Sequence, residues 1–283
     1  MNRPWIPCSS GASGNGFRIV SLNVLSPVLA QKYEHLYHFR YSAWSRRAPA
    51  ILEILERQNA DLYALQEVEE DLFPFFERAF ASTHSALYLK RKTKSDGLAL
   101  FVRNDTFEIV RSKDVQFPGT DNVAIALLLK YQTTKQVICV GATHLMFGEG
   151  EQDGLTRLGQ WKHLLSAMTE LQSTSQTAPM LICGDLNTRS TGTLLQKFLD
   201  ESWASAIPLQ SETGQAFSSL VGTERRLVDY IIYSKGSLAS LAMLQMHEVR
   251  DGKVFVGAEA NSEEEFQYSD HCVIGAEICF MNS

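Results

Sequence analysis

The sequence lacks several features that would assign it to a class at once. No apolar run approaches the ~20 residues that a membrane-spanning helix needs, and the first sixteen residues lack the continuous apolar core of a secretory signal. The five cysteines form no CxxC pair, and most lie in apolar, strand-like runs. We therefore expect reduced, buried thiols in a cytoplasmic protein, with mitochondrial or nuclear location left open, and neither a zinc site nor disulfides.

Positive charge is also scarce. The chain has 26 Lys and Arg residues against 32 Asp and Glu residues, a net charge of −6. A protein that binds nucleic acid with its whole surface is usually basic, so any contact with nucleic acid must here be local. Two basic clusters exist, Lys90–Lys94 and Arg225–Arg226. For each cluster alone, a solvated loop is the simpler interpretation.

The 283 residues contain no internal repeat, and no leucine-rich repeat that could dock the chain to a larger complex. Residues 1–16 are rich in Ser, Gly and Pro, which predicts a disordered lead-in. No linker interrupts the chain between residues 17 and 280. We therefore predict a single domain over residues 17–283.

Apolar, β-branched runs recur along the chain and are bounded by Gly, Asn, Asp or Ser, as in strands. Helical periodicity is present at Trp44–Gln58, Leu155–Leu171 and Thr193–Glu201. Strands follow one another without helices from about Leu87 to Leu145, which favours antiparallel pairing. The pattern predicts an α/β domain of two mainly antiparallel sheets that face each other, with helices outside.

One stretch, "PMLICGDLNTRSTG" at residues 179–192, combines a sheet interior with polar chemistry. The apolar run Met180–Cys183 ends abruptly in Gly184, Asp185 and Asn187. Residues i and i+2 of a strand point to the same face, so the acid and the amide can address one reacting group together. Gly184 would allow a close approach of backbone or substrate just before them.

Other strand-like runs also end or begin in residues of metal-binding or acid–base type. Each such residue alone is weak evidence for a site, because a lone Asp commonly forms a turn. Their number in one domain, however, predicts that these side chains meet at one rim of the sheets. These residues are Asn23, Glu67, His144, Asp185, Asn187, Asp229, Asp270 and His271. Glu67 and Asn23 offer oxygen donors, which suit Mg²⁺, with Mn²⁺ as a substitute. The set indicates metal-assisted phosphoryl transfer to water.

The ordered motifs "SLNVL", "LQEVE", "SDGLALF", "THL", "CGDLN", "VDYIIYS" and "SDH" resemble the endonuclease/exonuclease/phosphatase superfamily. The resemblance covers about Phe17 to Phe280. Within it, "AWSRRAPAILEIL", "LQEVE" and "DYIIYSK" resemble the branch of nocturnin, the Angel proteins and the carbon-catabolite-repression deadenylases. The resemblance implies a four-layer α/β sandwich and a catalytic domain at residues 17–283.

The resemblance also implies roles for the polar residues. Glu67 and Asn23 would bind Mg²⁺, with Asp270 assisting the metal or water network. Asp185 would deprotonate the attacking water, while Asn187 and His144 hold the phosphate. The same resemblance implies that His271 contacts the phosphate or transfers a proton, and that Asp229 fixes its ring.

Substrate binding is where the sequence departs from its relatives. Deadenylases of this branch often carry an aromatic residue shortly before the "DYI" motif, and this chain has Glu224 there. Arg225 and Arg226 resemble the basic loop of nocturnin, which accepts a dinucleotide with an extra phosphate; yet Met146 stands where nocturnin-like chains have a Lys. Phe217 could stack on a base, although a core aromatic is the simpler interpretation.

The sequence thus predicts a Mg²⁺-dependent phosphodiesterase, a 3′-to-5′ exoribonuclease of deadenylase-like type whose partner is the 3′ end of single-stranded RNA. The first alternative is a nocturnin-like phosphatase or diesterase on a small nucleotide such as NADPH. Further alternatives are an abasic-site DNA endonuclease, a phosphoinositide or sphingomyelin phosphatase, and a non-catalytic scaffold. The scaffold would require a missing catalytic position, and each position named above is present.

Overall fold

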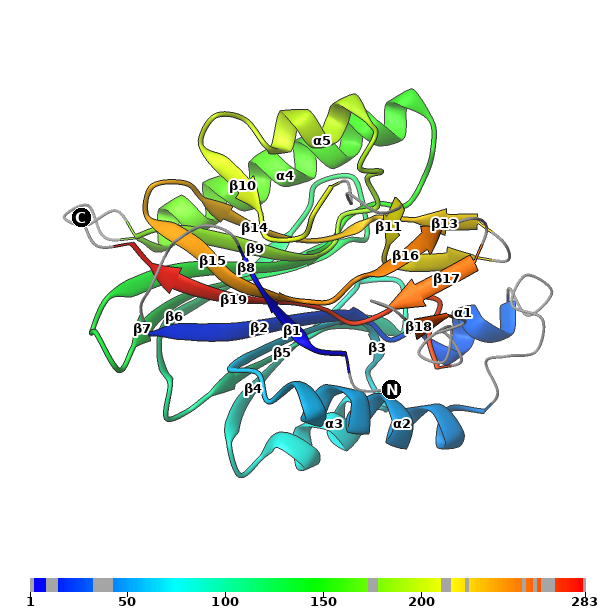
Figure 1. Cartoon of the computed structure of the whole chain (residues 1–283), viewed down its shortest axis with the longest axis horizontal. Helices are drawn as coiled ribbons and strands as arrows, with labels where there is room; N and C mark the ends of the chain where they lie inside the picture. The colour runs from blue at the N-terminus through cyan, green and yellow to red at the C-terminus, as the bar shows by residue number, and fades with distance from the viewer. Residues whose placement is uncertain are drawn as a thin grey trace.

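Two large β-sheets lie face to face, with helices on both outer sides (Figure 1). The computed structural model describes residues 3–8, 15–32, 43–172, 178–209, 215–221, 224–250, 253–256, 259–260 and 268–281. Helices α2 and α3 cover the first sheet, and α4 and α5 cover the second. The prediction of a four-layer α/β sandwich is confirmed.

The first sheet has seven strands. In spatial order they are β1 (Trp5–Pro7), β15 (Leu238–Leu244), β19 (Ile274–Phe280), β2 (Gly16–Asn23), β3 (Leu62–Glu69), β5 (Asp96–Arg103) and β4 (His84–Lys90). Only β2 and β3 run parallel within this sheet, and its other neighbouring strands are antiparallel. This parallel pair brings the carboxyl ends of two strands to one edge.

The second sheet has six strands and repeats that arrangement. In spatial order they are β10 (Trp203–Ser205), β14 (Asp229–Ser234), β9 (Met180–Asp185), β8 (Val137–His144), β7 (Val123–Tyr131) and β6 (Phe107–Gln116). Again one pair, β8 and β9, is parallel, and the other pairs of this sheet are antiparallel.

Two smaller sheets complete the described strands. One contains β11 (Gln215–Phe217), β16 (His247–Arg250), β17 (Lys253–Val256) and β18 (Glu259–Ala260), and the other contains β12 (Ser219–Val221) and β13 (Glu224–Arg226). Both lie beside the same end of the large sheets in Figure 1.

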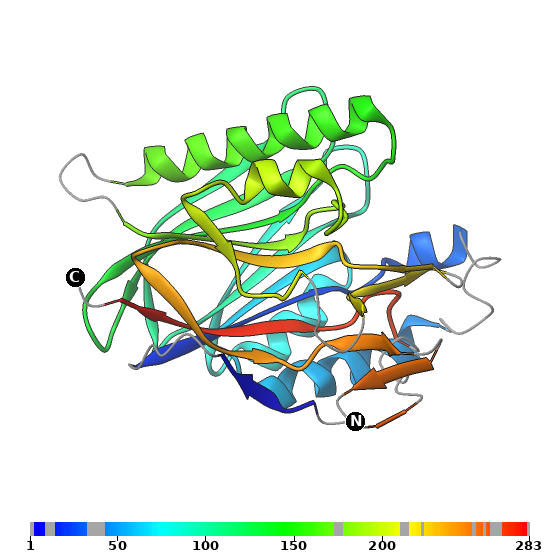
Figure 2. The same cartoon turned by 45° about the horizontal axis from the view of Figure 1, so that its top comes forward.

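The helices pack by amphipathic faces. They are α1 (Pro27–Lys32), α2 (Trp44–Gln58), α3 (Phe73–Phe80), α4 (Glu151–Leu171) and α5 (Thr193–Phe198). Ile51 and Leu55 of α2 pack on the outer face of the first sheet, and α4, the long green helix of Figure 2, lies along β6, β7 and β8. No helix within the described ranges is both long and apolar enough to cross a membrane.

Strand β3 shows how the sheets divide the core. Leu62 and Ala64 face the cluster between the two sheets, whereas Tyr63 and Leu65 face α2 and α3. Because both faces of β3 are covered, all eight of its residues are buried. This explains why the first four residues of β3, at 62–65, are all apolar and do not alternate with polar ones.

The structure corrects three expectations about where elements begin and end. Residues 5–7 of the predicted disordered lead-in form β1, which pairs with β15; residues 1, 2 and 9–14 of that lead-in lie outside the described residues. The third helix ends at Phe198 instead of Glu201. The expected helix from Leu155 begins earlier, at Glu151, because Asp153 accepts a hydrogen bond from the Gly150 N–H at its start (3.0 Å).

Candidate active site

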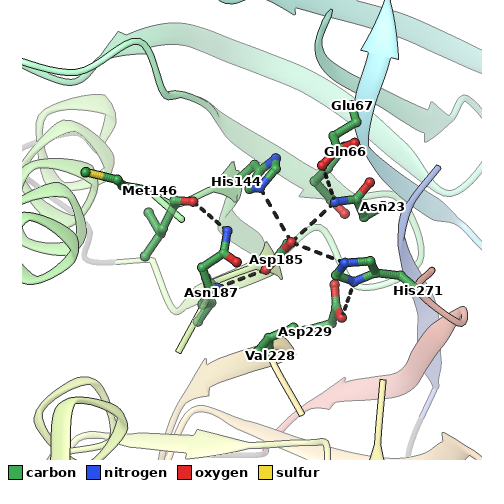
Figure 3. A network of polar contacts seen from close by, with 12 residues as sticks. Asn23, Gln66, Glu67, His144, Met146, Asp185, Asn187, Val228, Asp229 and His271 are labelled. Carbon is green, nitrogen blue, oxygen red and sulfur yellow. Dashed lines mark hydrogen bonds and ion pairs between the residues drawn. The ribbon is translucent and has the colours of Figure 1, made fainter. Parts of the chain in front are cut away.

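The predicted polar residues meet where the two parallel strand pairs end (Figure 3). Asn23 is the last residue of β2 and pairs in register with Gln66 of β3. His144 and Asp185 end β8 and β9 and pair in register with each other. The facing sheets therefore bring four strand ends to one rim.

Asp185 lies at the centre of this rim and is 2% exposed. Its Oδ1 accepts a hydrogen bond from the Asn187 N–H (2.9 Å), and its Oδ2 accepts one from Asn23 Nδ2 (3.3 Å). Gly184, just before it, has φ +137°, and a Cβ there would lie 1.9 Å from the carbonyl oxygen of Thr143. The predicted close approach at Gly184 is confirmed, and its partner is the backbone of β8.

The electrostatic surroundings make Asp185 a weak acid. Burial raises the pKa of its carboxyl to about 7, and the charge of Asp229 adds to the rise, while His271 opposes it. A carboxylate with a pKa near neutral pH is more basic than an exposed one and remains partly ionised under neutral conditions. Asp185 is therefore suited to accept a proton from water.

His271 and Asp229 form a hydrogen-bonded pair beside Asp185. His271 Nδ1 lies 2.8 Å from Asp229 Oδ2, which also accepts a hydrogen bond from Ser218 Oγ (2.6 Å). His271 Nε2 lies 3.7 Å from Asp185 Oδ2. Burial lowers the pKa of His271, but the charges of Asp229, Asp270 and Asp185 outweigh it and raise the pKa well above 6.5. The imidazole is thus held as a cation that faces Asp185.

His144 has the opposite character. Its Nε2 lies 3.5 Å from Asp185 Oδ2, and burial, followed by the charges of Arg91 and His271, lowers its pKa well below 6.5. Its Nδ1 is buried and makes no hydrogen bond with any residue of the described ranges. A neutral imidazole with an unused ring nitrogen can donate one hydrogen bond to a substrate oxygen.

Glu67 completes the rim from the first sheet. The pairing of β3 with β5 shifts between Gln66 and Val68, so Glu67 is the extra residue of a β-bulge and has φ +60°. Such a bulge re-aims a side chain next to an active site. The Glu67 carboxylate accepts hydrogen bonds from Asn23 Nδ2 (2.8 Å) and the Ser26 N–H (3.0 Å).

The Glu67 carboxylate is a group that could hold a divalent cation. Burial, and then the charge of Asp270, raise the pKa of Glu67, so the carboxylates here repel each other. A bound Mg²⁺ or Mn²⁺ would offset that repulsion, and carboxylate and amide oxygens are its usual donors. Asp185, Asp229 and His271 also place donor atoms within 4.8 Å of one another, and this cluster is a second group that could hold a cation.

Arg91 is a site residue that the sequence did not reveal. Its side chain is buried in an ion pair with Asp96, with Arg91 Nε 2.9 Å from Asp96 Oδ2. Its charge lowers the pKa of both Glu67 and His144. The expectation that the Lys90–Lys94 cluster is a solvated loop is therefore wrong for Arg91. An Asp five residues later was the available signal.

The predicted substrate-binding residues have different environments. Phe217 is 1% exposed and packs with Leu220 and Cys272, and the Arg225 guanidinium lies 5.8 Å from its ring centre. This burial corrects the expectation that Phe217 offers a stacking surface, and fits the simpler interpretation as a core aromatic. Arg226 lies instead at the rim of a pocket, where it contacts Glu149 and Glu224.

The facing sheets gather acids and imidazoles at one rim, an arrangement suited to acid–base chemistry. A family model described as the endonuclease/exonuclease/phosphatase family matches residues 20–271. The chain belongs to this family.

Individual relatives agree with the predicted branch. Nocturnin of Xenopus laevis is 30% identical over 263 residues, which are 83% of this chain and 66% of that protein. Human protein angel homolog 2 is 29% identical over 232 residues, 75% of this chain and 42% of that protein. The chain thus spans about two fifths of the length of this curated relative. The resemblance to the nocturnin and Angel branch is confirmed.

The fold has solved counterparts. ANGEL2, described as a 2′,3′-cyclic phosphatase and crystallised with adenosine-2′,3′-vanadate, superimposes with a TM-score of 0.81 and 21% identity. The superposition covers 98% of both chains. At this identity, the likeness establishes the fold.

Proposed function

We propose that the chain is a divalent-metal-dependent phosphodiesterase that cleaves RNA from its 3′ end, an exonuclease of the deadenylase-like kind. The observation that carries this proposal is the position of Asp185. This buried carboxyl, with its pKa raised to about 7, lies between His144, His271 and Asn23. Such a group can activate water while the donors around it hold a phosphate.

In the proposed reaction, Asp185 accepts a proton from water as the water oxygen attacks phosphorus. The ester bond to the leaving nucleoside oxygen breaks, and that oxygen takes a proton from solvent. Asn187 orients Asp185 through its backbone N–H. The His271 cation, held by Asp229, and neutral His144 face the position of the phosphoryl oxygens and stabilise their growing charge.

Glu67 and Asn23 would hold the metal, with Asp270 in the surrounding network. When bound, Mg²⁺ or Mn²⁺ supplies positive charge that stabilises the transition state at phosphorus. Asn23 joins the two parts of the site, because its Nδ2 contacts both Glu67 and Asp185. Its position also orients the Glu67 carboxylate, whose second oxygen is held by the Ser26 N–H.

A second candidate is hydrolysis of a terminal 2′,3′-cyclic phosphate, favoured by the description of ANGEL2 as a 2′,3′-cyclic phosphatase. A cyclic diester presents the same phosphorus chemistry to Asp185 without the need to cut a chain. Cleavage of NADPH is the nocturnin-like alternative. These three substrates differ in what flanks the phosphorus, and the same rim can serve each.

A substrate panel tests the proposal. With Mg²⁺ present, initial rates are measured on oligo(A), oligo(U), oligo(A) with a 2′,3′-cyclic phosphate end, NADPH, single-stranded DNA and an abasic duplex. The proposal expects stepwise shortening of oligo(A) from its 3′ end, abolished by EDTA. Faster reaction on the cyclic end, with no chain shortening, would replace it by the second candidate. Equal rates with and without EDTA would contradict metal dependence.

A further inference from the structure

A pocket opens beside the rim and contains residues that the chemistry described above does not use. Its volume is about 340 Å³, within the range of small-ligand sites. Asn187 lines it together with Phe147, Arg189 and Arg226. Because the Asn187 backbone N–H also contacts Asp185, the pocket lies next to the reaction centre.

Phe147 is the most exposed large apolar side chain in the described part of the structure, at 67%. It follows His144 by three residues, in the segment that leaves β8 (Figure 3 shows Met146 beside Asn187). An aromatic ring this exposed gains little from folding. Its position beside a reaction centre therefore indicates a ligand-facing role.

The backbone that carries Phe147 is held on both sides by α4. Arg157 donates hydrogen bonds to the carbonyl oxygens of Met146 (3.0 Å) and Gly148 (2.7 Å). Gln160 Oε1 accepts a hydrogen bond from the Met146 N–H (2.9 Å). The ring is thus presented from a fixed segment, which lowers the entropic cost of binding against it.

Glu149, Arg189 and Arg226 line the same pocket, and together with Glu224 they form an ion-pair cluster. Arg189 lies 2.7 Å from Glu149 and 2.5 Å from Glu224, and Arg226 contacts the same two carboxylates. Three of the four side chains are at least 44% exposed, and exposed ion pairs add little to stability. A phosphate can therefore displace the carboxylates at low cost and bind two guanidinium groups.

We propose that this pocket is a nucleotide subsite, in which a base stacks on Phe147 and a phosphate replaces Glu149 and Glu224 at Arg189 and Arg226. The inference rests on the proposed function, since it assigns the nucleotide that flanks the scissile phosphate. It also places the stacking residue in the segment after β8, whereas the position near the "DYI" motif holds Glu224, a member of the ion-pair cluster.

The test measures binding of AMP, ribose 5-phosphate and inorganic phosphate by calorimetry in EDTA. Phe147→Ala should weaken AMP about 10- to 100-fold and leave ribose 5-phosphate unchanged, and Phe147→Tyr should restore AMP binding. Arg189→Gln with Arg226→Gln should weaken all three ligands. Glu149→Gln with Glu224→Gln should tighten them, because the arginines lose their competing carboxylates.

Two variants control for loss of exposed groups elsewhere. Leu155→Ala removes a half-exposed apolar side chain of α4, and Arg57→Gln breaks a surface ion pair with Glu53 on α2. Both should bind AMP as the wild type does. The inference is overturned if wild-type protein binds no AMP, if Phe147→Ala binds it within twofold, or if Phe147→Ala weakens ribose 5-phosphate equally.

Working in EDTA separates this inference from the metal-dependent reaction. AMP binding that depends on Phe147, in a protein that cleaves no nucleotide with Mg²⁺, would support the subsite and overturn the proposed function. If the protein cleaves oligo(A) but its AMP binding does not depend on Phe147, Arg189 or Arg226, the proposed function is supported and the subsite is overturned.

Discussion

The two large sheets build their parts of the site from the same strand geometry and give them different chemistry. Each sheet contains one parallel pair among antiparallel neighbours, β2–β3 in the first and β8–β9 in the second. The first pair carries an amide at the end of β2, Asn23, and a carboxylate two residues before the end of β3, Glu67; the second pair ends in His144 and Asp185. Metal binding and water activation are therefore divided between the sheets in the proposed function.

The sheets also reach these positions by different distortions. Glu67 is displaced by a β-bulge and a positive φ, whereas Asp185 follows a glycine whose missing Cβ lets β9 approach β8. Asn23 Nδ2 then joins the two carboxylates, at 2.8 Å from Glu67 and 3.3 Å from Asp185. The comparison indicates that the strand ends determine where the two carboxylates lie. The local distortions determine the direction in which each carboxylate points.

The largest effect on turnover is expected from a substitution in the second sheet. Asp185→Asn keeps the shape of the side chain but removes the group that accepts a proton, so kcat should fall ~10²- to 10⁴-fold. Rates on oligo(A) at saturating Mg²⁺ measure the loss. An Asp185→Asn enzyme with normal kcat would exclude Asp185 as the base.

The matched control for this variant is Asp200→Asn, which also changes one carboxylate to an amide. Asp200 follows α5, is exposed, and accepts a hydrogen bond from the Ser202 N–H (2.8 Å). It is not among the residues that meet at the rim, so Asp200→Asn should keep full activity. A comparable loss in both variants would mean that the effect is not specific to the rim.

The next effect is expected from the first sheet. Glu67→Gln keeps a hydrogen-bonding side chain in the bulge but removes the negative charge that would hold the metal, so turnover should fall ~10²- to 10³-fold. The loss should shrink as Mg²⁺ is raised, because weaker binding can be overcome by concentration. Glu70→Gln, which alters an exposed carboxylate paired with Lys90, is the matched control. A loss of turnover in Glu67→Gln that is the same at every Mg²⁺ concentration would contradict the metal assignment.

A smaller effect is expected where Asp229 supports His271. Asp229→Asn removes the charge that holds His271 as a cation, so the pKa of His271 should fall and kcat should drop ~10- to 100-fold. Ser218→Ala removes one hydrogen bond to the same carboxylate, so it should lower kcat less than Asp229→Asn does. An NMR titration of the His271 ring measures the pKa directly. An unchanged His271 pKa in Asp229→Asn would show that the pair does not act in this way.

The smallest effect is a pH dependence of stability without metal. The folded pKa of Asp185 is about 7, against an ordinary value of 3.8, so the folded state binds more protons between these values. Its contribution to the free energy of unfolding must therefore fall as pH rises from about 4 to about 7. In EDTA, the difference in Tm between Asp185→Asn and the wild type should grow in favour of the variant across that window. A constant difference would argue against a raised pKa.

Much of this site follows from residues that a strand pattern can reveal. "CGDLN", "LQEVE" and "THL" each place a polar residue at the end of an apolar run, and parallel neighbours end at the same edge. The mainly antiparallel sheets follow from the same runs, because consecutive strands without intervening helices favour antiparallel pairing, whereas the four-layer sandwich was implied by the family resemblance. The bulge at Glu67 could not be predicted, since it depends on the register with β5.

Side-chain burial is where the sequence was least informative. Arg91 belongs to a basic run, yet its pairing with Asp96 buries it beside the site. Phe217 and Phe147 are both aromatic residues near polar motifs, and only the packing around them shows that the first is 1% and the second 67% exposed. β1 was missed because three residues carry too little periodicity, and its partner β15 lies more than 200 residues away.

The most direct test of the division between the sheets is the stabilisation of the protein by Mg²⁺ in variants of each sheet. Tm is measured against Mg²⁺ concentration for the wild type, Glu67→Gln and Asp185→Asn, alongside turnover of oligo(A). The account predicts that Asp185→Asn keeps the Mg²⁺-dependent rise in Tm while it loses turnover, and that in Glu67→Gln both the rise in Tm and turnover require a higher Mg²⁺ concentration. A rise in Tm that needs no more Mg²⁺ in Glu67→Gln than in the wild type, and disappears in Asp185→Asn, would contradict it.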